Sequence, residues 1–175
     1  EPNSARNTFD QDCIARAQHW NDSLLCTRES AELRAEALQM GYSLGELLRE
    51  SGIRWKVIVV SACYSGGFIE HLKDDSTLII TAARHDRSSF GCSDKNEFTY
   101  FGRAFFKEAL PRAQSFEDAF AKAGALVREW EEEDYASAPA GAKRKTMGTY
   151  YSHPQLHGTS AITQHLQQWW AQPVK

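Results

Sequence analysis

No apolar run in this 175-residue chain approaches the roughly 18 residues that a membrane-spanning helix needs, and the longest is Val57–Val60. We therefore expect no membrane span. An excess of basic residues is also lacking, because 20 Lys and Arg stand against 23 Asp and Glu, for a formal charge of −3. A mildly acidic chain has no overall positive field for phosphates, which argues against a nucleic-acid partner.

The cysteine pattern also excludes some site types. Cys13, Cys26, Cys63 and Cys92 form no Cys-x-x-Cys pair and have no zinc-finger spacing with histidine, so we expect no metal and no cofactor. Four cysteines are too few for a disulfide scaffold, so Cys13 and Cys26 could pair or remain thiols. An initiator Met is lacking as well, and we expect a processed product or a fragment.

What is present suffices for a packed core, since 42% of the residues are hydrophobic and 25% are charged. The pattern predicts a helical N-terminal segment over residues 1–42 and an α/β core over 43–175. Apolar spacing favours a helix over 30–40. Ser43 and Glu46 have the spacing of a capping box, which predicts that a new helix starts at Ser43 and ends at Gly52.

Two segments are predicted to be buried strands. Trp55–Ser61 is a continuous, mainly β-branched apolar run typical of a strand buried on both faces, and Thr77–Thr81 is a second. A short helix around Phe68–Leu72 separates them, so we expect a βαβ unit with parallel strands and a right-handed crossover.

Helices are predicted downstream of this unit. We expect a polar loop over 83–97, a flexible connection over 134–149, and helices over 98–110, from a Ser115 cap through Trp130, and over 161–170. Two strands are fewer than open sheets usually have. Weak strands elsewhere, a partner chain in a homo-oligomer, or absence of part of the domain would each explain the shortage.

Cys63 is the residue whose placement points to chemistry. The first strand delivers it to its carboxyl end, where open α/β sheets place ligand crevices. Gly66 and Gly67 allow a tight turn with bare amides near the thiol, which could stabilise an oxyanion. The helix that follows would favour a thiolate through its dipole. The alternative is that Cys63 is a small buried apolar residue.

The stretch Ser61-Ala62-Cys63-Tyr64-Ser65-Gly66-Gly67 resembles the nucleophile segment of the legumain family of cysteine peptidases, relatives of the caspases. The similarity covers about residues 43–130 and a C-terminal tail, and it is greatest to bacterial members. Its other segments, in similar order and spacing, are Ile80–Ala83, Arg87–Cys92, Phe98–Gly102 and Pro154–Ile162.

The resemblance implies a caspase-like three-layer fold, with a mostly parallel sheet flanked by helices, and cleavage of peptides or proteins through a thioester. It makes Cys63 the nucleophile, with its own amide in the oxyanion hole, and places Ser88 and Ser89 beside the first specificity pocket. Legumains usually prefer Asn or Asp before the scissile bond. Exported bacterial relatives would suggest a periplasmic or secreted location.

Two positions of that pocket depart from the family. Legumains have acidic residues where this chain has Ser61 and Arg103. Both positions remain candidate substrate-binding residues, but Arg103 would favour an acidic rather than an amide side chain in the substrate.

The histidine base is the larger departure. A Cys nucleophile needs a His to take its proton and return it to the leaving amine. The family's His-Gly lies before the nucleophile, and this chain has none there. His19 lies at about the expected separation but lacks the strand and the Gly, so we predict a helix-surface residue. His157-Gly158 lies after Cys63 and is predicted to be non-catalytic. The other histidines are His85, in the pocket loop, and His71, His153 and His165.

Three functions therefore follow from the sequence. The first is a legumain-like cysteine peptidase. The second is a catalytically incomplete module that binds an extended peptide or a partner protein at its sheet edge and pocket. The third is a thiol redox protein that uses Cys63 and Cys92.

Overall fold

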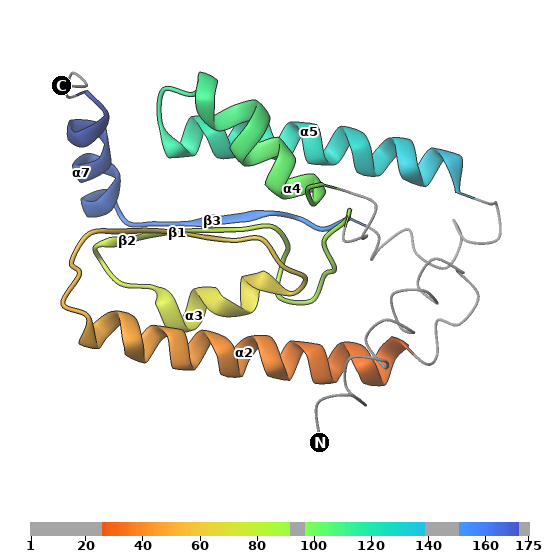
Figure 1. Ribbon diagram of the computed structural model, residues 1–175, viewed down its shortest axis with the longest axis horizontal. Coiled ribbons are helices and arrows are strands. Elements are labelled where there is room, and N and C mark those ends of the chain that lie inside the picture. Colours follow the sequence, from red (N-terminus) through yellow and green to blue (C-terminus); the bar gives the residue numbers. More distant parts are fainter. Residues whose placement is uncertain (1–25, 92–96, 139–150, 172–175) are drawn as a thin grey trace.

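The computed structural model describes residues 26–91, 97–138 and 151–171 (Figure 1). Predictions that concern His19, Cys13, Cys92 and the side chain of Cys26 lie outside what it describes. The elements, in chain order, are α2 (Cys26–Glu50), β1 (Lys56–Val60), η1 (Ser65–Phe68), α3 (Ile69–Leu72), β2 (Thr77–Thr81), α4 (Tyr100–Gly102), η2 (Arg103–Ala109), η3 (Leu110–Arg112), α5 (Phe116–Ser137), β3 (Gln155–His157) and α7 (Ser160–Trp170).

The elements form three layers. A mixed sheet in the order β1-β2-β3 lies in the middle. Helices α2 and α3 cover one face, α4 and α5 cover the other, and α7 lies at one end of the strands (Figure 1). This is the predicted α/β architecture, consistent with a caspase-like fold whose sheet is incomplete.

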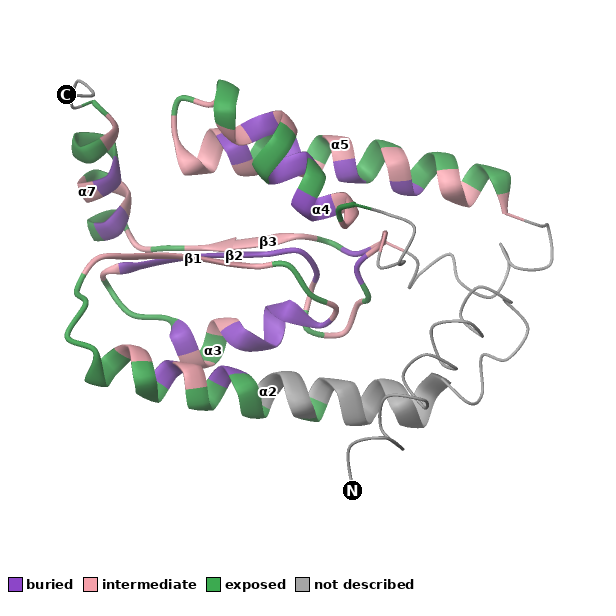
Figure 2. Cartoon of the chain, in the orientation of Figure 1, coloured by how far each residue is buried: buried purple, intermediate pink, exposed green. Residues whose placement is uncertain are grey.

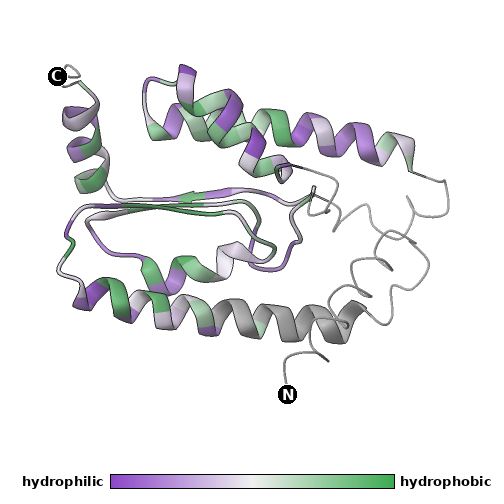
Figure 3. Cartoon of the chain, in the orientation of Figure 1, coloured by the Kyte–Doolittle hydropathy of each residue, from purple (hydrophilic) through white to green (hydrophobic). Residues whose placement is uncertain are grey.

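The predicted strand-helix-strand order with two parallel strands is confirmed. β1 and β2 are parallel, with Lys56 opposite Thr77 and Val60 opposite Thr81. β2 is buried throughout, whereas every residue of β1 is only half-buried (Figure 2). β1 is only half-buried because it lies at a sheet edge among the described strands, but apolar core packs against both of its faces, as predicted. Apolar residues run along both strands (Figure 3).

A weak third strand supplies part of the missing sheet. β3 pairs antiparallel with β2, so that His157 lies opposite Ile79 and Gln155 opposite Thr81. Three residues are too few to show a periodic pattern, so the sequence did not identify this strand. Of the three explanations for a short sheet, a hidden strand is correct in part.

The core has two parts, one on each face of the sheet. The larger part lies under η2, α5 and α7 and includes Phe101, Phe105, Leu78 and Ile80. The smaller part fills the space between the sheet and the α2–α3 layer, with Ile79 at its centre. Both parts pack against β1 and β2, so the sheet is fixed from either side at the strand ends that carry the site.

Helix α2 passes through residue 43 without a break, so the predicted helix start at Ser43 is wrong. The reason is tertiary packing. Leu44 and Leu48 pack on the smaller core, and a Cβ on Gly45 would lie 2.5 Å from the carbonyl oxygen of His71. Close contact with α3 keeps the helix continuous where the local capping motif favoured an interruption. The division of the chain at residue 42 stays a prediction.

The later helices follow the sequence closely. Ser115 caps α5 as predicted, because its Oγ accepts a hydrogen bond from the Asp118 amide at 3.0 Å. α5 extends to Ser137, so the flexible connection predicted over 134–149 is wrong at residues 134–137, and its remainder from residue 139 lies outside the described residues. Pro111 lies in the last turn, η3, rather than beyond it, and α7 matches its prediction to within one residue. None of the described helices is long and apolar enough to cross a membrane.

Candidate active site

Cys63 lies in the turn that follows β1, at the carboxyl end of the parallel strands. The next residue, Tyr64, has φ 58°, a left-handed conformation that a bulky residue rarely adopts. The turn is held by hydrogen bonds from the Tyr64 amide to the Arg87 carbonyl and from the Gly66 amide to the Ala83 carbonyl, both 2.8 Å. Strained backbone that surrounding contacts over-determine is common at functional sites.

The Cys63 sulfur is half-buried against Ser89. The Ser89 amide donates a hydrogen bond to Sγ at 3.3 Å. The Ser89 hydroxyl oxygen lies 3.8 Å from the sulfur, and the thiol can donate to the Ser89 carbonyl oxygen at 3.7 Å. An N–H group directed at sulfur stabilises negative charge there, so this geometry suits a nucleophilic thiolate.

The two glycines have a different use from the one predicted. The amides of Tyr64, Gly66 and Gly67 all donate to carbonyl oxygens, so these three are not bare oxyanion donors. The segment after Cys63 is a 3-10 turn followed by a four-residue helix, too short to supply the predicted dipole. The donor to the sulfur is the amide of Ser89, from another loop.

Gly66 is needed because the 84–85 backbone packs directly on it. A Cβ at Gly66 would lie 2.5 Å from the His85 nitrogen and 2.9 Å from the Arg84 carbonyl carbon. Any larger residue would push the loop that carries Ser89 away from Cys63. The Gly-Gly signal in the sequence therefore reports a close approach of two loops.

A small ion-pair network fixes that loop. Arg84 Nη2 donates to Asp86 Oδ2 at 2.9 Å, and Arg87 Nη1 donates to the same oxygen at 2.8 Å. The hydrogen bond from Arg84, with the positive charges of both arginines, lowers the pKa of Asp86 to about 2, although burial opposes the shift. These ion pairs restrain the loop at Asp86, two residues before Ser88.

The predicted pocket residues are brought together only in part. The Ser88 hydroxyl donates to the Tyr64 hydroxyl at 3.4 Å, so Ser88 and Ser89 both contact the Cys63 turn. The Ser61 hydroxyl lies 2.9 Å from that of Thr99, whose side chain caps α4. Sequence reasoning missed Thr99. Its signal is a hydroxyl residue immediately before the Tyr-Phe-Gly segment.

Arg103 follows α4 but extends along α5. Its guanidinium lies 5.0 Å from the centre of the Trp130 ring and 3.5 Å from the Glu108 carboxylate. The side chain is 56% exposed, so its charge remains accessible to solvent. Arg103 is four residues after Thr99 along the chain, and its positive charge is exposed to solvent.

The described histidines lie apart from the sulfur or in other contacts. His157 in β3 is opposite Ile79, two strands from β1 and well short of the strand ends, on the order of 15 Å from Cys63 by sheet geometry. His165 stacks on Trp55 at 4.1 Å, and His71 contacts Tyr42 edge-on. His85 and His153 are exposed. Among these five histidines, none forms a hydrogen bond with Cys63 Sγ.

Metal binding finds no support in the described part of the chain. No group of three or more His, Cys, Asp or Glu side chains there could hold a metal ion.

Comparison with known proteins gives one match. The sequence model of the Peptidase C13 family matches residues 11–156. No curated protein matches the chain, and no solved structure does.

Proposed function

The chain belongs to the Peptidase C13 family of cysteine peptidases, and from that premise we propose that Cys63 is the nucleophile of peptide-bond cleavage. The family match agrees with the resemblance to legumains that Ser61–Gly67 suggested. The observation that carries the assignment to Cys63 is its sulfur, half-buried at the end of a parallel strand with the Ser89 amide donating to it at 3.3 Å.

In the proposed reaction the Cys63 thiolate attacks the carbonyl carbon of the scissile peptide bond. A histidine base first takes the thiol proton. The tetrahedral oxyanion accepts a hydrogen bond from the Cys63 amide, the C–N bond breaks, and the same base returns the proton to the leaving amine. Water then hydrolyses the thioester and restores the thiol. Ser88 and Ser89 would line the path of an extended substrate, and no cofactor takes part.

Arg103 supports a preference for an acidic substrate residue. The guanidinium is exposed and follows the α4 segment that contacts Ser61. Stacking on Trp130 restricts its motion, so less side-chain entropy is lost when it pairs with a carboxylate. We therefore propose that Ser61 and Arg103 belong to the pocket for the residue before the cleaved bond.

Alkylation separates the peptidase from other thiol proteins. With iodoacetamide at neutral pH, we expect the Cys63 peptide to be modified at least tenfold faster than those of Cys13, Cys26 and Cys92, as mass spectrometry would show. Cys63→Ala should abolish cleavage of a peptide library, and Cys26→Ala should not. Equal alkylation of all four thiols together with full cleavage by Cys63→Ala would sink the proposal.

A second candidate is a catalytically incomplete module that binds peptides or a partner protein. It is favoured by the sequence, in which no His-Gly dipeptide precedes Cys63 as it does in the legumain family. Such a module would retain peptide binding in Cys63→Ala and would show no cleavage in either form. A redox protein would instead show a reversible loss of two hydrogens that involves Cys63 and Cys92.

A further inference from the structure

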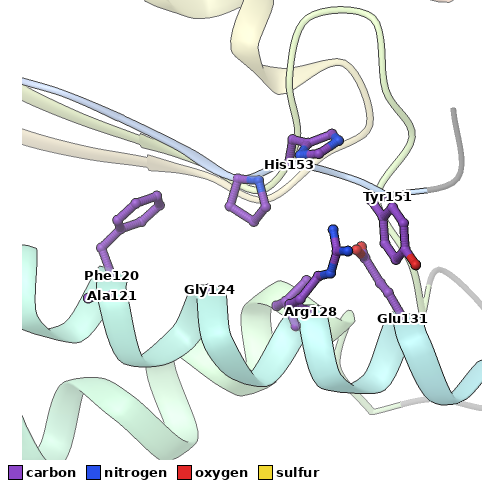
Figure 4. A pocket seen from close by; sticks show the side chains of 9 residues that line it. Phe120, Ala121, Gly124, Arg128, Glu131, Tyr151 and His153 are labelled. Atoms are coloured by element: carbon purple, nitrogen blue, oxygen red, sulfur yellow. The ribbon is translucent and has the colours of Figure 1, made fainter. Parts of the chain in front are cut away.

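A cavity of about 270 Å³ lies between α5 and the segment that leads into β3. It is separate from the Cys63 turn, because its walls come from α5 on one side, including Gly124 and Val127, and from Tyr151, His153 and Pro154 on the other. Figure 4 shows Phe120 at one end of the cavity and a cluster of polar side chains at the other. Both an apolar and a polar half are therefore present.

The polar half is built around the Arg128 guanidinium. Its Cζ lies 3.6 Å from the centre of the Tyr151 ring, and its Nε donates to Glu132 Oε1. These two contacts fix the plane of the guanidinium. Its Nη1 and Nη2 atoms make no hydrogen bond to any residue in the described part of the chain, so a fork of two donors remains available at the cavity.

Glu131 also lines the cavity, and its carboxyl group interacts with the Ser152 backbone as well as with the charge of Arg128. The side chain is 1% exposed, and the Ser152 amide donates to both carboxylate oxygens, at 3.2 and 3.3 Å. Burial raises the pKa of this carboxyl, which makes its ionised form less favourable than usual. Because this carboxylate already accepts hydrogen bonds from the Ser152 amide, it is a poor partner for a cationic ligand.

Three arginines act on His153 at this end of the cavity. Although His153 is exposed, partial burial of its ring, followed by the positive charges of Arg84, Arg87 and Arg128, lowers the pKa of His153, and Asp86 opposes the shift. The second cause of this shift, the arginine charges, would also attract an anion.

We propose that this cavity binds a small carboxylate that carries an apolar group, with the carboxylate on Arg128 and the apolar part against Gly124 and Phe120. Planar bidentate donors match a carboxylate. Gly124 is one helical turn from Arg128, about 6 Å along α5, and Phe120 is about 12 Å away. A ligand the size of 3-phenylpropanoate, either as a free acid or as the C-terminal residue of a peptide, reaches from the guanidinium past Gly124 toward Phe120.

The glycine allows a clean test of the cavity. A Cβ on Gly124 would meet no atom within 4 Å, so Gly124→Leu fills the apolar half without a backbone clash and improves helix propensity. Arg128→Met removes the fork and keeps the stem. Arg112→Met is the matched control, because Arg112 is 76% exposed and does not line the cavity.

The experiment is an NMR titration of the full chain with 3-phenylpropanoate, which we expect to bind with a dissociation constant of about 1–10 mM. Gly124→Leu and Arg128→Met should each weaken binding at least tenfold, with circular dichroism unchanged, and Arg112→Met should bind like the original chain. The neutral 3-phenylpropanamide should bind at least tenfold more weakly. Unsaturable binding by the original chain, equal binding by Gly124→Leu, or equal binding of the amide would overturn the proposal.

A second arm distinguishes the two sources of the carboxylate. N-acetyl-Gly-Phe with a free C-terminus is compared with its C-terminal amide. Tighter binding of the peptide acid than of 3-phenylpropanoate would assign the site to peptide C-termini, and equal binding would assign it to free acids. Binding of the peptide amide as tight as that of the peptide acid would contradict the carboxylate role in either case.

Discussion

At the scale of single residues, the position of Ser89 depends on the charge of Asp86. The two arginines around Asp86 hold the turn from which the Ser89 amide reaches the sulfur. The folded-state pKa is about 2 against an ordinary 3.8, so the stabilisation is complete above about pH 4 and is lost as the pH falls through 2.

We therefore expect Asp86→Asn to lower the free energy of unfolding by roughly 1–2 kcal/mol at pH 7, after allowance for partial exposure, and by almost nothing near pH 2. Thermal unfolding at pH 7, 4 and 2.5 measures this difference. Asp75→Asn is the control, since its carboxylate has no ion pair in the described part of the chain. A pH-independent difference would show that the carboxylate charge is not what holds the turn.

Arg103 gives a second prediction for a single residue. If its guanidinium faces the substrate, Arg103→Gln should reduce the ratio of kcat/KM for an Asp substrate to that for the matching Asn substrate by about tenfold. Arg112→Gln removes the same charge at a residue outside the proposed pocket, so it should leave that ratio unchanged. A ratio that does not move in Arg103→Gln would remove Arg103 from the specificity pocket.

The sequence located Cys63 correctly at the end of a strand, because a β-branched run followed by two glycines is a strong local signal. It could not locate the donor to the sulfur, since a backbone amide has no identity in a sequence. Only the resemblance to legumains drew attention to Ser89. The actual use of Gly66 depends on the 84–85 backbone, which is close in space and 18 or more positions away along the chain.

At the scale of elements, two helical glycines have opposite environments. A Cβ on Gly45 would lie 2.5 Å from the His71 carbonyl oxygen, and one on Gly124 would meet nothing within 4 Å. We expect Gly45→Ala to reduce the free energy of unfolding by about 1–3 kcal/mol through overpacking against α3. Gly124→Ala should raise it by about 1 kcal/mol through helix propensity.

Urea denaturation of the two alanine variants provides the measurement, and each serves as the other's control for the intrinsic effect of replacing a helical glycine. If both variants were stabilised equally, the close approach of α2 and α3 would not be present in solution. The close packing of α2 on α3 also explains why the capping motif at Ser43 misled the prediction. A local signal worth about 1 kcal/mol was outweighed by packing between elements that are remote in sequence.

At the scale of the whole molecule, the sheet is protected unevenly. β2 lies between two strands, whereas β1 has one described neighbour and carries an apolar sequence with a charge only at Lys56. Alternate amides of β1 therefore point away from β2. An apolar edge of this kind is a template for pairing with another strand.

We expect these outward amides to exchange with solvent at least about 100-fold faster than the amides of β2. Hydrogen exchange followed by NMR at several protein concentrations tests this. Slow exchange at every β1 amide would mean that another strand covers the edge. Loss of that protection on dilution would identify a second copy of the chain, and its persistence would identify a segment of the same chain.

The fold as a whole could be predicted to the level of three layers and one parallel pair. β2 and α7 were placed almost to the residue, because buried apolar runs and amphipathic spacing are visible locally. β3 was missed, because its three residues form a strand only through their hydrogen bonds to Ile79–Thr81. A short strand that is stabilised only by pairing with another strand has no local pattern by which its sequence could identify it.

The contacts between Glu131 and Ser152 have a consequence for the integrity of the molecule. The hydrogen bonds from the Ser152 amide to the Glu131 carboxylate and the stacking of Arg128 on Tyr151 join α5 to the segment that starts at residue 151, so the parts of the chain before residue 138 and after residue 151 are also held together by these contacts. β3, paired with β2, anchors the downstream portion again. A polypeptide severed between these positions would persist as a noncovalent complex of a long and a short piece, with the cysteine turn wholly in the long one.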